Sequence, residues 1–202
     1  MKMTTLKLSV LACAAIVTGL MSCGKEEVPA PPPNPSVTVT DSIEVPFSST
    51  ASYTLFSFKN GAVVANSDSI STDWDFGLTY VNFIVNSHAS GPGNGGVITE
   101  IGLYDTLSLA PATGYAYDTT TNATQLAINN GLTTGWYNYD LTTHNLSPKA
   151  GLYFVFRTAD NHYAKMEVLS VGYSGYNGPN SPPTTLIYKF QYSYQSDGSG
   201  NF

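Results

Sequence analysis

The stretch GLYFVFRTADNHYAKMEVLSVG, Gly151–Gly172, contains two apolar-rich runs separated by a short polar segment. Asp160 and Asn161 lie in that segment, and both residue types tolerate the left-handed backbone conformations of tight turns. The sequence therefore predicts a β-hairpin whose two strands are Leu152–Arg157 and Tyr163–Val171.

The second strand of this hairpin alternates between apolar and polar side chains. Met166 and the apolar residues two positions away predict a face packed on the core, whereas Lys165 and Glu167 predict a face in contact with water. The first strand is apolar on both faces, which predicts a central position in a sheet. A shift of one residue would bury Lys165 and Glu167, so we expect a well-specified register.

The connections between the other expected strands are rich in Gly, Pro and Asn. Asn60-Gly61 is a strong signal for a tight hairpin turn. His88–Gly96 is interpreted as a flexible loop because five of its residues are Gly or Pro. Ala110–Asn122 has no periodicity and is expected to be a long loop.

The same patterns define the fold class. No stretch sustains an amphipathic helical pattern, so we expect one all-β domain over residues 36–202, an antiparallel sandwich or a partly open barrel. Besides the hairpin, the expected strands are Val37–Val45, Ser52–Lys59, Ala62–Ala65, Trp74–Val85, Val97–Tyr104, Gln125–Ile128, Trp136–Leu141 and Thr185–Tyr194.

The composition limits the partners of this domain. Of the 202 residues 11% are charged, against about 25% in typical soluble domains, and Tyr, Ser, Thr, Asn and Gly supply the polarity instead. The formal net charge is −6. Because a negative surface repels phosphate backbones, the sequence argues against nucleic acid as a partner.

The first 22 residues predict an export signal. Two lysines precede the apolar run Leu8–Leu20, which is short for a membrane span. The run is followed by Ser22-Cys23, which is similar to the lipobox of bacterial lipoproteins. Residues 1–22 are therefore expected to be a lipoprotein signal peptide. Cys23 is expected to begin the mature chain and to carry acyl chains, such as palmitate, that anchor it to a membrane.

Residues 23–35 are expected to be a lipidated linker. Gly24–Glu27, GKEE, is similar to the tag on lipoproteins that Bacteroides-like bacteria display on their outer surface. Val28–Pro35 contains five prolines, which favour polyproline II and a stiff spacer. We therefore expect a protein anchored by lipid in the outer membrane and facing the cell exterior.

The motifs of common enzymes are missing from the sequence. It has no G-x-S-x-G, H-E-x-x-H, C-x-x-C or phosphate-binding glycine loop. Its two cysteines, Cys13 and Cys23, belong to the signal peptide and the anchor, so we expect no disulfide and no cysteine-ligated metal in the domain. A binding protein is expected, and not an enzyme.

Two carboxylates flank Trp74. Asp73 and Asp75 would project from the same face of a strand. Such a pair can bind a cation, but it lacks the glycine turn and the third ligand of a calcium loop. A polar strand edge beside Trp74 is therefore the favoured interpretation.

Three histidines are the remaining candidates for a ligand-binding site. His162 belongs to the turn of the hairpin, where an exposed structural role is expected. His88 opens the glycine-rich loop, whose flexibility would suit the capture of a ligand. His144 follows an aromatic segment and precedes Pro148, and it is the strongest single candidate.

Four motifs follow one another along residues 36–195. They are TDWDF (Thr72–Phe76), GWY-x-YD-x-x-x-H-x-x-x-P (Gly135–Pro148), the hairpin from Tyr153 to Tyr173, and YKFQY (Tyr188–Tyr192). Taken together, these motifs resemble the HmuY family of lipoproteins from Bacteroides-like bacteria. The resemblance implies an all-β fold with finger-like strands.

Described members of that family take haem from host carriers and pass it to an outer-membrane receptor. The resemblance implies haem b as the cofactor, with the iron held by a histidine pair or a methionine pair. Met166 is the only methionine outside the signal peptide, so a methionine pair is not available. His144 is the expected ligand and His88 the expected second ligand, with Tyr115 and Tyr117 as alternative donors. No metal other than haem iron is expected.

Two functions remain open on the sequence alone. A haem-binding surface lipoprotein predicts a dry, aromatic-lined cleft with nitrogen ligands facing each other. The alternative is a surface binding or adhesion module without haem activity, whose exposed aromatic rings would contact glycans or proteins.

Overall fold

The computed structural model describes residues 36–122, 125–178 and 181–202, and this part of the chain contains no α-helix. Its strands pair antiparallel throughout, so the all-β prediction is confirmed. The elements are β1 (Thr38–Pro46), β2 (Thr54–Ser57), β3 (Ala62–Val64), η1 (Asn66–Asp68), β4 (Phe76–Thr79), β5 (Asn82–Val85), β6 (Gly96–Ile101), η2 (Tyr104–Thr106), β7 (Tyr137–Tyr139), β8 (Leu146–Pro148), β9 (Leu152–Arg157), β10 (Tyr163–Ser174) and β11 (Thr185–Gln195).

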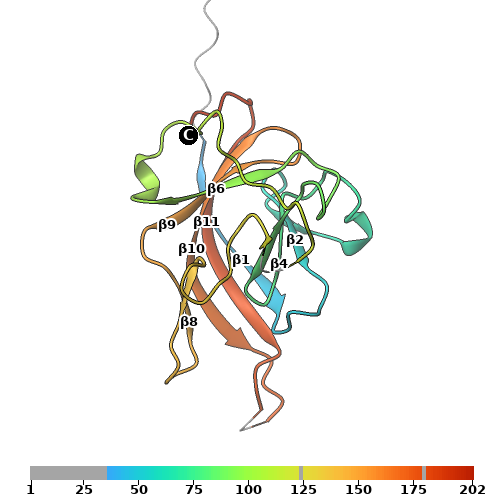
Figure 1. The fold of residues 1–202 in the computed structure, drawn as a ribbon, viewed down its shortest axis with the longest axis vertical. Coiled ribbons are helices and arrows are strands. Elements are labelled where there is room, and N and C mark those ends of the chain that lie inside the picture. Colours follow the sequence, from blue (N-terminus) through green and yellow to red (C-terminus); the bar gives the residue numbers. More distant parts are fainter. Residues whose placement is uncertain (1–35, 123–124, 179–180) are drawn as a thin grey trace, which may run out of the picture. The chain divides into compact units, whose positions relative to one another are not determined.

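The strands form two sheets and a separate hairpin (Figure 1). The larger sheet has the order β1-β11-β10-β9-β6, and the smaller sheet has the order β3-β2-β4-β5. One buried cluster takes apolar side chains from both sheets, which therefore pack as the two layers of a sandwich. The hairpin of β7 and β8 shares no ladder with either sheet, but its Tyr137 and Leu146 join the buried cluster, and it positions the candidate site described below.

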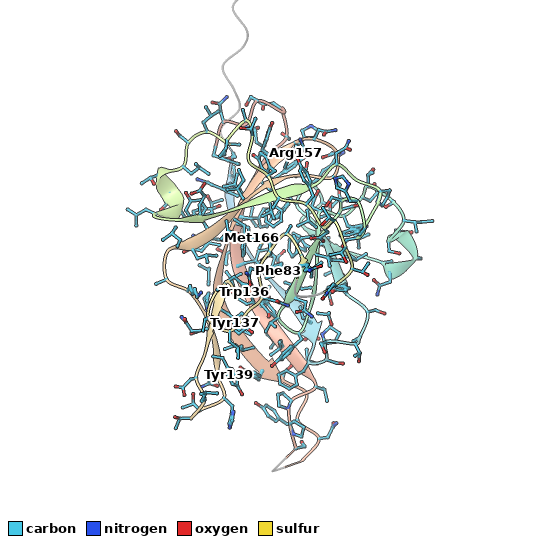
Figure 2. The ribbon with its side chains drawn as sticks, in the orientation of Figure 1. Phe83, Trp136, Tyr137, Tyr139, Arg157 and Met166 are labelled. Atoms are coloured by element: carbon cyan, nitrogen blue, oxygen red, sulfur yellow. The ribbon has the colours of Figure 1, made fainter. Side chains whose placement is uncertain are left out.

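Aromatic rings fill much of the core. Phe56 meets Phe190 edge to face with ring centroids 5.2 Å apart, and Phe83 meets Trp136 in the same way at 5.4 Å (Figure 2 labels the second pair). Such pairs contribute about 0.5–1.5 kcal/mol each beyond the burial of their surface. The indole Nε1–H of Trp136 also donates to the carbonyl of Val81 (3.0 Å). Trp136 immediately precedes β7 and thereby ties that strand to the core.

The hairpin predicted from Gly151–Gly172 is confirmed. β9 and β10 pair from Tyr163 opposite Arg157 onward, and β9 lies between β10 and β6, the central position expected for a strand that is apolar on both faces. Asn161 in the turn has φ 68°, the left-handed conformation that the turn residues predicted.

A β-bulge interrupts β10. Val168 pairs with Phe190 and Ser170 with Lys189, so Leu169 is an extra residue without a partner on β11. Bulges of this kind bend a strand and increase its twist.

The prediction that Lys165 contacts water is wrong. The side chain is only 6% exposed, and its Nζ donates to the carbonyls of Tyr104 (3.1 Å) and Leu107 (2.9 Å). The Tyr104 ring lies 4.5 Å and the Phe202 ring 5.3 Å from the same nitrogen, as cation–π partners. Burial lowers the pKa of Lys165, although Asp105 acts in the opposite direction. Residues around η2 and at the end of the sequence therefore cover a face that the local pattern assigns to solvent.

The long apolar run Trp74–Val85 is two strands and not one. β4 and β5 form a hairpin whose turn holds Tyr80 at φ 49°. Trp74 precedes β4, and its indole Nε1–H donates to the carbonyl of Ser69 (3.0 Å). Residues 76–79 and 82–85 are all buried, so an apolar run alone gives no signal for the reversal.

Two of the expected strands, Gln125–Ile128 and Trp136–Leu141, differ from the structure. Gln125–Ile128 forms no strand, although Ile128 is buried in the core. Trp136–Leu141 contains β7, which is shorter than expected and pairs with β8. The sequence pattern did not indicate β8, because three residues are too few to show a period.

The loop His88–Gly96 is tightly packed, which contradicts the expected flexibility. A Cβ atom on Gly91 would lie 2.2 Å from Oδ1 of Asn86, and one on Gly93 would lie 2.7 Å from Cβ of Ala159. Asn86 is fully buried, and its Oδ1 accepts the N–H of Gly93 (2.8 Å). The glycines therefore allow close approach to the sheet and do not indicate mobility.

The predicted signal peptide, the lipidation site at Cys23 and the proline-rich linker lie outside the described residues. Across residues 36–122, 125–178 and 181–202, no helix has the length and apolarity that a membrane crossing requires.

Candidate functional site

The β7–β8 hairpin carries His144 in its turn. Oδ1 of Asp140 accepts the N–H groups of Thr142 (2.7 Å) and Thr143 (3.1 Å), and the N–H of His144 donates to the Asp140 carbonyl (2.8 Å). The hydrogen bonds from Thr143 and Thr142 lower the pKa of the Asp140 carboxyl. These bonds close the turn and leave His144 at φ 57°, a conformation that glycine adopts without strain.

His144 lines a cleft of about 360 Å³. The cleft is bounded by this hairpin, by the end of the β10–β11 hairpin and by residues next to β1 and β4; both hairpins extend at the lower end of the view in Figure 1. A volume of this size falls within the range of about 300–1,000 Å³ that is typical of small-molecule pockets. The lining residues are Phe47, Tyr80, Tyr139, Thr143, His144, Asn145, Leu146, Tyr173, Tyr176, Pro182 and Pro183.

One wall of the cleft is a row of aromatic rings in fixed contact. Phe47 meets Tyr80 edge to face at 5.2 Å and Tyr173 at 6.2 Å between ring centroids. The N–H of Tyr80 donates to the Pro46 carbonyl (3.0 Å), and its own carbonyl accepts the hydroxyl of Tyr188 (2.6 Å). These bonds hold the wall in place without a ligand.

His144 also lines the cleft. Its Nδ1 lies 2.7 Å from the hydroxyl of Tyr139. The hydroxyl of Tyr173 accepts the N–H of Leu146 (2.7 Å) and donates to the carbonyl of His144 (3.3 Å). Among the described residues, no hydrogen bond is made to Nε2, so this nitrogen is available to a ligand in the cleft.

Burial raises the pKa of two of the cleft phenols. It raises the pKa of Tyr80 above its usual value of 10.0, with a further contribution from Tyr139, and it raises the pKa of Tyr173, although the bond from Leu146 opposes this rise. Ferric iron is bound by the deprotonated phenolate, so a raised pKa makes Tyr80 and Tyr173 harder to recruit as iron ligands. His144 is the strongest donor in the cleft.

The structure does not bring His88 to this cleft. The ring of His88 meets the ring of Tyr117 at 5.2 Å, and Nη2 of Arg157 donates to the hydroxyl of Tyr117 (2.8 Å). In Figure 2, Arg157 and Tyr139 lie toward opposite ends of the fold. His88 therefore lies at the Arg157 end and His144 at the Tyr139 end, and the two histidines do not face each other.

The alternative donors Tyr115 and Tyr117 also lie away from the cleft. The guanidinium of Arg157 lies 5.8 Å from the ring of Tyr115 and 5.4 Å from that of Tyr117. Burial raises the pKa of Tyr115 to about 12, and its hydroxyl donates to the Pro111 carbonyl (2.9 Å). Both rings therefore anchor the long loop and do not line the cleft with His144.

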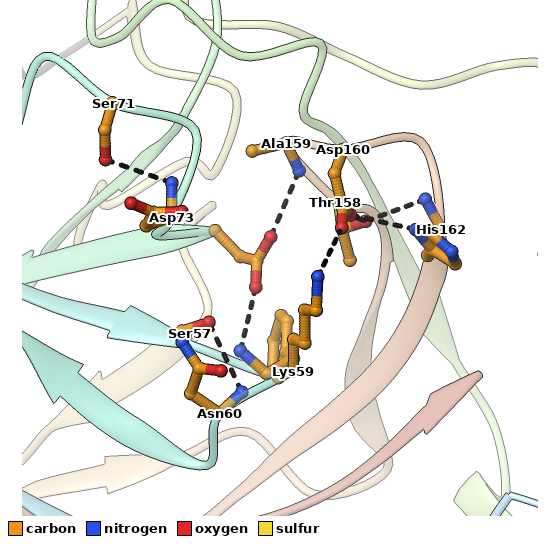
Figure 3. Close-up of polar contacts among 11 residues, drawn as sticks. Ser57, Lys59, Asn60, Ser71, Asp73, Thr158, Ala159, Asp160 and His162 are labelled. Carbon is orange, nitrogen blue, oxygen red and sulfur yellow. Dashed lines mark hydrogen bonds and ion pairs between the residues drawn. The ribbon is translucent and has the colours of Figure 1, made fainter. Parts of the chain in front are cut away.

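His162 is part of the turn structure, but it is half-buried and not exposed as expected (Figure 3). Its Nδ1 lies 3.0 Å from Oδ1 of Asp160, and its backbone N–H donates to Oγ1 of Thr158 (2.8 Å). Nζ of Lys59 lies 3.9 Å from the second oxygen of Asp160. Burial acts to raise the pKa of Asp160, but the bonds from Thr158 and His162 outweigh it and the pKa is lowered.

Asp73 and Asp75 do not share a face, so the predicted polar strand edge is wrong. Asp73 is exposed, whereas Asp75 is 5% exposed, and its two oxygens accept the N–H groups of Phe58 (2.8 Å) and Ala159 (3.1 Å). Asp75 thereby ties the end of β2 to the β9–β10 turn. Burial raises the pKa of Asp75 to about 6, against the lowering effect of those two bonds. The described residues contain no group of three or more side chains able to hold a metal ion.

Sequence reasoning missed most of the residues that shape the cleft. Phe47, Tyr80 and Tyr173 come from three separate segments, so no local pattern connects them. A usable signal existed for the hairpin: the polar stretch DLTTHN, residues 140–145, separates two short runs that can pair. Recognising that turn would have placed Tyr139 next to His144.

The residues of the cleft fit haem through one axial histidine. Haem requires apolar walls and at least one strong iron donor. The cleft supplies aromatic walls and Nε2 of His144, and its lining contains no second histidine. A facing pair of histidines, as expected from the sequence, does not match this geometry.

No family model matches the chain, and no curated protein matches it. Among solved structures, it is similar to a candidate HmuY-like heme-binding protein from Bacteroides vulgatus, with 14% identity over 77% of this chain and 92% of that chain and a TM-score of 0.45. An apo HmuY analog from Tannerella forsythia matches at 12% identity, over 78% and 97% of the two chains, with a TM-score of 0.48. A candidate lipoprotein from Bacteroides fragilis matches at 13% identity, over 77% and 89%, with a TM-score of 0.46. The likeness of the chain to these two proteins described as HmuY-like and to this lipoprotein is a likeness in fold alone.

Proposed function

We propose that this protein is a lipid-anchored surface protein of the outer membrane that binds haem b in the cleft beside His144. The observation that carries the haem assignment is an imidazole with an available Nε2 in a cleft lined by aromatic rings. The flat, largely apolar faces of a porphyrin suit aromatic walls, and a neutral imidazole is a common axial ligand of haem iron. The proposed role is binding and not catalysis. As the family resemblance implies, haem would come from host carriers and pass to an outer-membrane receptor.

A haemin titration with two matched variants tests this proposal. His144→Gly removes the imidazole and suits the left-handed backbone at that position, so the domain is expected to fold. Because the iron donor itself is lost, we expect haem affinity to fall by about 100-fold, the upper end of what even outer-shell substitutions cost at metal sites. The Soret and visible bands of the bound haem are expected to change as well.

His88→Gly is the control for this experiment. His88 also has a left-handed backbone, at φ 45°, but lies away from the cleft, so this variant is expected to bind haemin as the wild type does. The absence of any Soret shift in the wild type would reject haem. Equal losses in the two variants, or an unchanged spectrum in His144→Gly, would reject His144 as the ligand.

Anchoring through Cys23 makes a separate prediction. Cys23→Ala removes the acceptor of the acyl chains, so we expect the folded domain to leave the membrane fraction and its intact mass to lack lipid. Cys13→Ala, a change within the expected signal peptide, should leave lipidation intact. A Cys23→Ala protein that stays with the membranes would contradict the lipoprotein assignment.

A second candidate function, glycan binding without haem, is favoured by a different pocket. This pocket, of about 400 Å³, lies beside β2 and β5 and is lined by Tyr53, Trp74 and several hydroxyl groups, with no charged side chain among its lining residues. Such a lining suits a neutral, hydroxyl-rich ligand. If haemin gives no Soret shift, NMR titration with soluble glycans, followed at the Tyr53 ring, would test this alternative.

A further inference from the structure

Two tyrosines support His144 from different elements. Tyr139 is the last residue of β7 and pairs across the hairpin with Leu146 of β8. Its ring centroid lies 6.0 Å from that of His144, and its hydroxyl is 2.7 Å from Nδ1. Tyr173 reaches the same turn from β10, and its hydroxyl is hydrogen-bonded to the backbone there, at the Leu146 N–H and the His144 carbonyl.

We infer that Tyr139 and Tyr173 are positioning residues that hold His144 with Nε2 directed to a ligand in the cleft. Tyr139 fixes the ring, because an Nδ1–H that donates to its hydroxyl oxygen leaves the lone pair on Nε2. Tyr173 fixes the backbone of the turn and ties the hairpin to the larger sheet. The part of this inference that concerns iron rests on the proposed function.

The geometry explains why this turn needs support. His144 is exposed and has a left-handed backbone, so neither burial nor its own conformational preference holds the side chain in one place. Histidines that bind metals generally donate their second ring N–H to an oxygen acceptor, which orients the ring and makes the ligating nitrogen more basic. Tyr139 supplies such an acceptor within hydrogen-bonding distance.

The test compares Tyr139→Phe with Tyr176→Phe. Both substitutions remove one hydroxyl from the lining of the cleft, but among the described residues only that of Tyr139 contacts the His144 ring. In the ligand-free protein, the ring ¹⁵N resonances of His144 should shift in Tyr139→Phe and remain unchanged in Tyr176→Phe. Haemin affinity should fall about tenfold in Tyr139→Phe alone, the lower end of the range for outer-shell partners.

A further readout concerns the iron itself. Loss of the Nδ1–H bond makes the imidazole a weaker donor, so the reduction potential of bound haem should become more positive in Tyr139→Phe. Tyr173→Phe should broaden the backbone amide signals of residues 140–146, because it frees the Leu146 N–H.

The outcomes separate the two proposals. Unchanged His144 ring resonances in Tyr139→Phe, or equal affinity losses in Tyr139→Phe and Tyr176→Phe, would overturn the positioning role. If the wild type does not bind haemin, the haem proposal fails, while the ¹⁵N measurement still decides whether Tyr139 orients the ring.

Discussion

The Met166→Asp variant is expected not to fold. Met166 is 1% exposed and pairs with Phe154 on β9 and with Tyr192 on β11, so it lies in the interior of the larger sheet. A carboxylate at this position would have no partner, and burying it costs at least several kcal/mol, while a whole domain is typically stable by only about 5–15 kcal/mol. Circular dichroism in a urea series is expected to show no cooperative transition for this variant.

Met166→Leu is the matched control. It keeps the volume and apolar character of the side chain, so its cost should stay below about 1.5 kcal/mol. A Met166→Asp protein that unfolds cooperatively near the wild-type midpoint would show that the side chain of residue 166 does not face the core.

Removal of the Asp75 carboxylate is expected to have the second-largest effect. Asp75→Ala leaves the buried N–H groups of Phe58 and Ala159 without acceptors, each at a cost of about 1–3 kcal/mol. The free energy of unfolding, measured in urea, should therefore fall by about 2–6 kcal/mol if the two costs add. Asp73→Ala is the control, because Asp73 is exposed and its change should stay within about 0.5 kcal/mol. If Asp75→Ala and Asp73→Ala lowered the free energy of unfolding equally, the bonds from Asp75 to Phe58 and Ala159 would not stabilise the fold.

The same carboxylate gives a pH dependence with a defined sign. Its pKa is raised to about 6 in the folded protein, against about 3.9 in an unfolded chain. Between those values the folded state binds more protons, so the contribution of Asp75 to stability falls as the pH rises from about 4 to 6. Asp160, His162 and Lys59 also face this region. The pKa of Asp160 is lowered in the folded protein, so the contribution of Asp160 to stability is lost as the pH falls below about 4, the opposite sign to that of Asp75. The free energy of unfolding of wild type and of Asp75→Asn, measured across pH 4–7, isolates the contribution of Asp75. The fall in stability between about pH 4 and 6 that Asp75 causes should be absent from the variant.

Local patterns predicted the strands well where their period is long enough to read. β10 and β11 follow from alternation within one segment, β9 from its continuous apolar run, and the turn at Asn161 from its residue types. Lys165 was misplaced because the residues that cover it, Tyr104 and Phe202, are remote in sequence. Asp75 was misread for the same reason, since one of its partners, Ala159, lies 84 residues away.

The candidate site was predicted only in part. His144 could be selected because it lies in an aromatic segment, but its distance from His88 depends on which loops the two sheets bring to each end. Tyr173 belongs to a segment whose facing is set by the bulge at Leu169, and no alternation rule anticipates an extra residue. Such features are tertiary in origin and need a structure.

The bulge at Leu169 changes which residues of β10, the even-numbered or the odd-numbered, face the core. Before it, the even-numbered residues Ala164, Met166 and Val168 face the core; after it, the odd-numbered Val171 and Tyr173 pack against the same cluster. Because of this one extra residue, the first part of β10 packs in the core, and Tyr173 in its second part lines and supports the cleft. If Leu169 instead took a place in a regular ladder with β11, Gly172 would face the cleft and Tyr173 would point outward. The bulge therefore decides whether the hydroxyl of Tyr173 can reach the backbone next to His144.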